Sequence, residues 1–165
     1  MQKSFLKKIL VAVNGSESSI HAAMYAIMFA SSYKIDMKAL YVVDSATIKT
    51  LGRKNILIHD EALQFEQDLI TEGNGCLDYI KGLAGTKGLE IETELRSGKV
   101  FKEIIKGAKE YEADLIILGG EEKKDRDYIA HRNVISEHRN ELLSLAECPV
   151  LVVNEPDIQA EFNSF

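Results

Sequence analysis

Residues 113–120 read Ala-Asp-Leu-Ile-Ile-Leu-Gly-Gly, and residues 121–127 continue Glu-Glu-Lys-Lys-Asp-Arg-Asp. The first segment is a short apolar run closed by two glycines, which is typical of a buried strand that ends at a turn. The second segment is a dense run of mixed charge. In an open α/β sheet, ligands bind beside the turn that follows such a strand. The sequence therefore raises the question of whether the turn at Gly119 and Gly120 binds a ligand.

Four further segments are typical of strands. Residues 8–14 hold the run Ile-Leu-Val-Ala-Val, which is apolar on both faces, as in a central parallel strand that is covered on both sides. Residues 37–43 and 149–153 are similarly apolar. Residues 89–96 alternate strictly between apolar and polar side chains, which predicts a half-exposed edge strand.

Segments with helical spacing of apolar residues separate these strands. The spacing predicts helices over residues 18–32, 60–84, 98–111 and 133–145. Ser16 and Ser97 are the expected N-caps of the first and third helices. The long second helix crosses Gly73-Asn74-Gly75, where each of the two glycines should cost about 1 kcal/mol relative to alanine.

Two segments have no clear period. We expect residues 45–59 to be a connection with one short helical turn. Residues 154–165 form an acidic tail with two phenylalanines. This tail could cover the edge of the sheet next to residues 150–153, or it could be disordered.

The alternation of strands and helices predicts the α/β class, with a single open five-stranded parallel sheet and helices on both faces. Right-handed crossovers leave few topologies for such a sheet. One domain over residues 1–153, followed by the tail, accounts for all 165 residues.

Composition excludes several function classes. The net charge of −6 argues against broad binding to nucleic acid or to anionic membranes, and no apolar run is long enough to span a bilayer. With only two cysteines and no signal-peptide pattern, the chain is expected in the cytoplasm. Its four histidines lack metal-ligand spacing, and no nucleophile motif is present. We therefore predict neither a metal site nor an enzyme.

Three segments together resemble the universal stress protein family: residues 9–17 (Ile-Leu-Val-Ala-Val-Asn-Gly-Ser-Glu), residues 113–119, and residues 148–153 (Cys-Pro-Val-Leu-Val-Val). The resemblance covers about residues 5–153. It implies a Rossmann-like sheet of the adenine nucleotide alpha hydrolase type, with strand order 3-2-1-4-5. It also implies a homodimer, often formed by the last strands pairing across a two-fold axis.

Members of this family that bind ATP resemble one another in the loop after strand four, which reads Gly, two residues, Gly, nine residues, then Gly followed by Ser or Thr. Gly119 matches the first glycine, but Glu122 stands at the second. The last position falls on Arg132-Asn133, or on Ser136-Glu137 if the segment has one extra helical turn. Nucleotide binders also usually have an aspartate where this chain has Asn14.

These departures predict that the chain lacks the ATP binding typical of the family. A loop that binds phosphate usually needs glycine so that consecutive N–H groups can turn toward the anion. Glu121 and Glu122 would repel a triphosphate unless a metal or the basic residues Lys123, Lys124 and Arg126 offset them. The alternative is a nucleotide-binding relative in which Lys123, Lys124 or Arg132 replaces the glycine loop.

Part of a binding site could still remain at the ends of strands one, two and four. The candidate binding residues are Ala12, Val13, Asn14, Val42, Leu118, Gly119 and Gly120. They match the adenosine side of the family's site better than its phosphate side, so a nucleoside or another small ligand is possible. The competing interpretation is that these residues are strand ends closed by packing. The sequence leaves both open.

Overall fold

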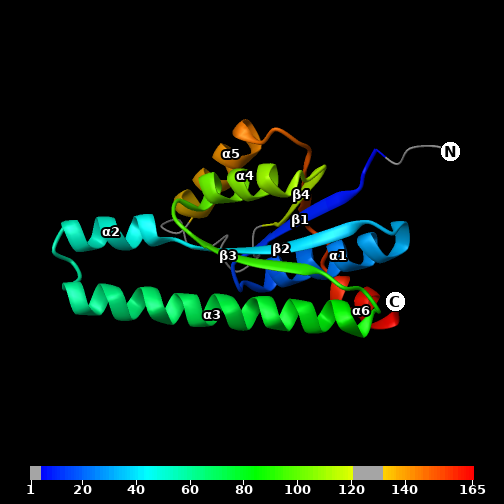
Figure 1. The fold of residues 1–165 in the computed structure, drawn as a ribbon, viewed down its shortest axis with the longest axis horizontal. Helices are drawn as coiled ribbons and strands as arrows, with labels where there is room; N and C mark the ends of the chain where they lie inside the picture. Colours follow the sequence, from blue (N-terminus) through cyan, green and yellow to red (C-terminus); the bar gives the residue numbers. More distant parts are fainter. Residues whose placement is uncertain (1–4, 121–131) are drawn as a thin grey trace.

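The structure is a computed structural model, and it describes residues 5–120 and 132–165. Five strands form one parallel sheet in the order β3-β2-β1-β4-β5 (Figure 1). The strands are β1 (Lys8–Val13), β2 (Asp36–Val43), β3 (Glu92–Ser97), β4 (Leu115–Gly119) and β5 (Val150–Val153). The predicted class and strand order are confirmed.

Helices cover both faces of the sheet. Helices α1 (Glu17–Tyr33) and α3 (His59–Thr86) pack on one face, and α4 (Val100–Tyr111) and α5 (Arg132–Leu145) pack on the other. Successive residues of a strand point to opposite faces. Val11 therefore belongs to the α1/α3 core and Leu10 to the α4/α5 core, and both side chains are fully buried.

The first helix begins as predicted. The Oγ atom of Ser16 accepts the backbone N–H of Ser19 at 3.2 Å, which makes Ser16 the N-cap of α1. Glu17 in the first turn places a negative charge at the positive end of the helix dipole. This cap fixes the start of α1 directly beyond the end of β1.

The connection after β2 is more ordered than the sequence predicted. Residues 45–53 form the nine-residue helix α2 (Ser45–Arg53) in place of a single short turn. Asp44 is its N-cap, because its carboxylate accepts the Thr47 N–H at 3.1 Å and the Thr47 hydroxyl at 2.7 Å. Only Ser45 and Ile48 of this helix are buried, so no apolar stripe marks it in the sequence.

The C-terminal segment also contains a helix, α6 (Ile158–Ser164), which the sequence analysis did not predict. Ile158 and Phe162 lie one turn apart and are buried in the α1/α3 core. The Lys87 ammonium group also makes a cation–π contact with Phe162, at 4.6 Å from the centroid of its ring. Two well-buried anchors hold this end of the chain against the domain.

The start of α4 differs from the prediction. Ser97 does not cap the helix, because it is the last residue of β3 and pairs with Val43 of β2. The N-cap is Lys99, which makes no side-chain capping bond. The strand β3 also begins at Glu92, three residues later than the expected start at Leu89.

The two edges of the sheet carry different side chains. The edge strand β3 holds Glu94 and Arg96, which pair at 2.6 Å, and Lys38 of β2 pairs with Glu94 at 3.2 Å. The opposite edge strand β5 is the apolar run Val-Leu-Val-Val, of which only Val153 is buried. Among the described helices, none combines the length and the apolar character that crossing a bilayer requires.

Candidate ligand site at the carboxyl ends of the strands

The candidate site lies where β1 and β4 end side by side. The chain leaves β1 into α1 on one face of the sheet, whereas α5, the helix between β4 and β5, packs on the other face. Such a divergence of connections opens a crevice at the carboxyl ends of parallel strands. Residues 121–131, which connect β4 to α5, lie outside the described residues. The predicted roles of Glu121, Glu122, Lys123, Lys124 and Arg126 fall within that segment.

Three of the predicted residues share one face. Ala12, Val42 and Leu118 are buried at the ends of adjacent strands and all belong to the α4/α5 core. Val13 points to the opposite face and packs in the α1/α3 core. The structure therefore brings together an apolar floor of three side chains and separates Val13 from it.

Asn14 shapes the turn after β1. Its Oδ1 atom accepts the backbone N–H of Ser16 at 3.0 Å, and its own N–H donates to Ser19 Oγ at 3.3 Å. A side-chain oxygen that bonds to the backbone two residues ahead is an Asx turn. Gly15 follows with φ of +81°, in the left-handed region that favours glycine. The side-chain oxygen of Asn14 therefore already accepts a hydrogen bond within the turn.

Close packing accounts for the glycines at the end of β4. A Cβ atom at Gly119 would lie 2.6 Å from the Ser18 carbonyl oxygen. A Cβ atom at Gly120 would collide with the Asn154 side chain, and the Gly120 N–H donates to Val153 O at 2.9 Å. Gly119 therefore lets β4 approach the first turn of α1, and Gly120 continues the pairing with β5.

Arg139 of α5 reaches the end of β4. Its Nη2 atom donates to the Gly119 carbonyl oxygen at 3.1 Å. Sequence reasoning missed this residue, although Arg139 stands three residues before the buried Leu142 and therefore faces the sheet on the same side of the helix. The guanidinium group places a positive charge at the α5 side of the site.

Acidic groups lie on the opposite side. A Cβ atom at Gly15 would lie 3.5 Å from Glu72 Oε1, so this α3 carboxylate stands beside the turn after β1. Burial raises the pKa of the Tyr41 hydroxyl, and the nearby Glu72 charge raises it further. Burial likewise raises the pKa of the Cys76 thiol. Sequence reasoning missed Glu72 because nothing in the local pattern shows which part of the long helix α3 crosses the strand ends.

The position at which α5 begins distinguishes the two alignments of the family's phosphate loop, which end at Arg132-Asn133 or at Ser136-Glu137. The helix begins at Arg132, so Asn133 lies in its first turn. Only the first four N–H groups of a helix lack a helical acceptor, and Ser136 stands beyond them. The register that ends at Ser136 therefore does not offer its backbone N–H to an anion.

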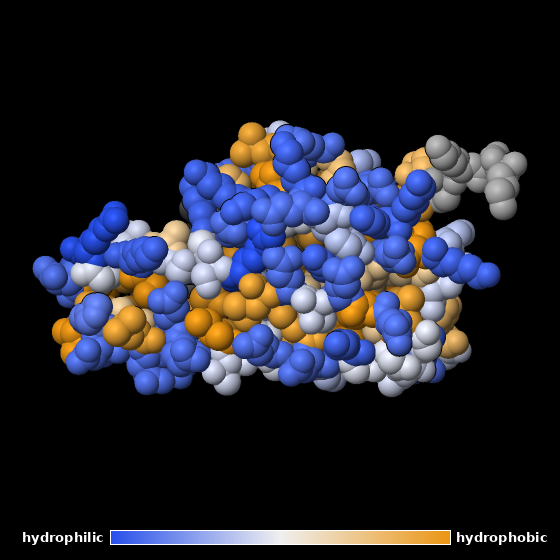
Figure 2. Space-filling view, in the orientation of Figure 1, coloured by the Kyte–Doolittle hydropathy of each residue, from blue (hydrophilic) through white to orange (hydrophobic). Residues whose placement is uncertain are grey.

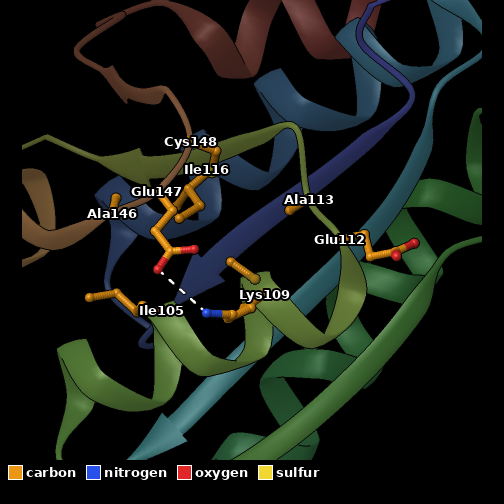
Figure 3. Close-up of a pocket in the computed structure, with 9 residues that line it drawn as sticks. Ile105, Lys109, Glu112, Ala113, Ile116, Ala146, Glu147 and Cys148 are labelled. Carbon is orange, nitrogen blue, oxygen red and sulfur yellow. Dashed lines mark hydrogen bonds and ion pairs between the residues drawn. The ribbon is translucent and has the colours of Figure 1, made fainter.

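A separate hollow of about 250 Å³ lies at the amino ends of β4 and β5. Figure 3 shows its lining, with Ile105 and Lys109 from α4, Ile116 from β4, and Glu147 and Cys148 from the segment before β5. The Lys109 and Glu147 side chains point toward one another and pair at 3.5 Å. This hollow is at the end of β4 remote from Gly119, so it is not part of the crevice. No cluster of three or more metal-ligating side chains occurs among the side chains that the structure describes, those of residues 5–120 and 139–165.

The profile of the family described as "Universal stress protein family" matches residues 6–154. The chain belongs to this family. It is 30% identical to the universal stress protein MJ0531 of Methanocaldococcus jannaschii over 155 residues, which cover 93% of this chain and 85% of that protein. The match to residues 6–154 confirms the predicted family and agrees with the predicted extent of the resemblance, about residues 5–153.

Solved structures of universal stress proteins share the fold. UspA from Lactobacillus plantarum superposes with a TM-score of 0.72 at 21% identity, over 92% of this chain and all of that chain. The Archaeoglobus fulgidus universal stress protein in complex with dAMP superposes with a TM-score of 0.62 at 15% identity, over 91% of this chain and 99% of that one.

Proposed function

We propose that this universal stress protein is a dimeric binding or regulatory module of the stress response that neither hydrolyses ATP nor binds it through the family's phosphate loop. The observation that carries the proposal is the environment of Gly119. The one glycine that matches the phosphate loop is required for packing on Ser18, and its carbonyl oxygen is bound by Arg139.

Charge supports the same proposal. A triphosphate needs a cluster of donors or cations, because its charge must be offset where it binds. In the described part of the site, the Arg139 guanidinium lies at the end of β4, and the Glu72 carboxylate lies beside the turn after β1. Asp44, which follows β2, adds a second carboxylate near the strand ends, where it caps α2. The site thus fits a nucleoside or a monophosphate better than ATP.

Isothermal titration of the protein with ATP and Mg²⁺ tests the proposal. We expect no binding in the micromolar range, and micromolar binding would overturn it. Adenosine and AMP, titrated in parallel, separate a nucleoside site from strand ends that are simply closed by packing. Replacement of Ala12 by leucine narrows the space at the strand ends and should abolish the heat of specific binding. Because Ala12 is buried in the α4/α5 core, the melting temperature of the variant is measured alongside to show that it is folded.

The alternative function is nucleotide binding through a variant basic loop. The solved universal stress protein in complex with dAMP supports nucleotide binding as a second candidate, because this chain shares its fold over 91% of its length. The triple variant Lys123→Ala, Lys124→Ala and Arg132→Ala tests it. A thermal shift by ATP that is present in the parent protein and lost in the variant would support the basic loop. No shift in the parent protein would reject it.

The dimer is proposed to form through β5. The strand is an apolar edge whose first three residues are only half-buried in the single chain, and such an edge needs covering. The helix α6 packs its buried residues in the α1/α3 core and so leaves the outer edge of β5 for a partner. A mass by light scattering equal to one 18.4 kDa chain at micromolar concentration would contradict the proposal.

A further inference from the structure

Helix α2 and the beginning of α3 form an arm, defined here as residues 45–68. Figure 1 shows the two helices antiparallel at the left end of the molecule, where they extend beyond the sheet. Helix α2 follows the end of β2, and the chain then turns back through residues 54–58 into α3. The arm therefore stands out from the domain with its turn at the far end.

Large apolar side chains gather near the tip of the arm. Their exposed fractions are Ile56 62%, Ile58 64%, Leu63 54% and Phe65 46%. Figure 2 shows apolar residues among the charged ones at this end of the molecule. The other exposed large apolar residues of the described chain are Phe5, Tyr33, Tyr79, Leu143, Leu145 and Phe165. An exposed apolar group bordered by charge is typical of an interaction surface.

The charges that border these residues are divided between the two helices. Lys49, Arg53 and Lys54 lie on α2 and at its end, whereas Asp60, Glu61 and Asp68 lie on the first turns of α3. All six side chains are exposed. Within the described part of the chain, none of them forms an ion pair. The arm thus has a basic helix, an apolar tip and an acidic helix.

We propose that the arm pairs with the arm of a second copy of this chain around a two-fold axis. Such an interface is isologous, so α2 of one copy contacts α3 of the other and the reverse contact occurs as well. The basic helix then meets an acidic helix twice, and the apolar tips cover each other. An anionic membrane fits less well, because the acidic half of the arm would be repelled. This interface is separate from the proposed pairing of β5.

The apolar part is tested with the double variant Ile58→Glu and Phe65→Glu. Both side chains are exposed in the single chain, so the fold should not change. Sedimentation equilibrium should show that the average mass falls at least about twofold relative to the parent protein, whether or not the β5 interface forms. The matched control is Tyr79→Glu on the same helix, which is 54% exposed and lies outside the arm. An unchanged mass in the double variant would overturn the proposal.

The charge pairing is tested with two reversed variants. The first carries Lys49→Glu, Arg53→Glu and Lys54→Glu, and the second carries Asp60→Lys, Glu61→Lys and Asp68→Lys. Each variant alone places like charges across the two-fold axis and should lose arm pairing. An equal mixture should regain the parent mass, because the acidic arm of the first variant then faces an arm whose only remaining acid is Glu66. The proposal would be contradicted if the mixture failed to associate. It would also be contradicted if the parent protein bound anionic vesicles and did not self-associate.

Discussion

The ring of Tyr41 occupies the space that a side chain at Gly73 would need. A Cβ atom at Gly73 would lie 2.7 Å from Tyr41 Cδ1 and 2.8 Å from Leu95 Cδ1. Gly75, two residues further along α3, has no atom within 4 Å of the same position. Helix α3 therefore crosses the sheet closely at one glycine and not at the other.

This contrast predicts opposite effects of alanine at the two glycines. Gly73→Ala should destabilise the fold by about 1–3 kcal/mol, because the new methyl group overpacks against Tyr41. Gly75→Ala should stabilise it by up to about 1 kcal/mol, because alanine is the better helix former. Denaturant unfolding of both variants measures the difference. Equal effects of the same sign would show that α3 does not cross β2 this closely.

The packing of Gly119 leads to a second prediction. Gly119→Ala should lower the free energy of unfolding by about 1–3 kcal/mol without any ligand present, because Cβ would push against the Ser18 carbonyl group. Gly85→Ala is the control, since nothing lies within 4 Å of its Cβ position inside α3. If Gly119 served only a ligand, its replacement would leave the stability of the free protein unchanged.

The C-terminal helix supplies a third prediction. Phe162→Ala should cost about 3–5 kcal/mol, because a buried aromatic side chain leaves a cavity when it is truncated. Phe165→Ala should change stability by less than about 0.5 kcal/mol, since surface substitutions are usually neutral. The two phenylalanines are 3% and 53% exposed, respectively. Chemical denaturation distinguishes them, and similar effects would show that α6 is not docked on α1.

The ion pairs of the edge strand predict a dependence of stability on pH. Arg96 pairs with Glu110 of α4, and its hydrogen bond holds the pKa of that carboxyl below its ordinary value of 4.5. A lowered carboxyl pKa stabilises the folded state above the pKa of the unfolded chain. This stability is lost as the pH falls from the ordinary glutamate range through the lower folded pKa.

The variant Glu110→Gln isolates this contribution. As the pH is lowered from neutral to acid, the free energy of unfolding should decrease less steeply in the variant than in the parent protein. The control is Glu90→Gln, because Glu90 forms no ion pair among the described residues. Identical slopes in the parent protein and in Glu110→Gln would rule out the assigned role.

The strands could be predicted because each has its own signature in the sequence. Alternation marked the exposed strand β3, and continuous apolar runs marked the covered strands β1 and β2. Helix α2 could not be predicted in the same way, because Ile48 is its one buried large side chain and gives no period. Helix α6 is only two turns long, so Ile158 and Phe162 form too short a pattern.

For the candidate site, the sequence allowed prediction of the strand ends that form it but not of the contacts between its residues. The strand ends with Ala12, Val42 and Leu118 follow from topology, whereas the packing of Gly119 on Ser18 depends on how closely α1 approaches β4. The reach of Arg139 to Gly119 likewise depends on the placement of α5. Such distances between helices and strands are set by the packing of the whole core, and no local pattern encodes them.

The two edge strands of the sheet, charged β3 and aliphatic β5, limit how many chains can join by strand pairing. An incoming strand at β3 would meet the ion pairs of Lys38, Glu94 and Arg96, whereas β5 presents only aliphatic side chains. If two copies join through β5, each leaves its charged strand β3 on the outside. The extended sheet would then end on both sides at a strand that resists further pairing, so association by this route stops at two chains and does not continue into a fibre.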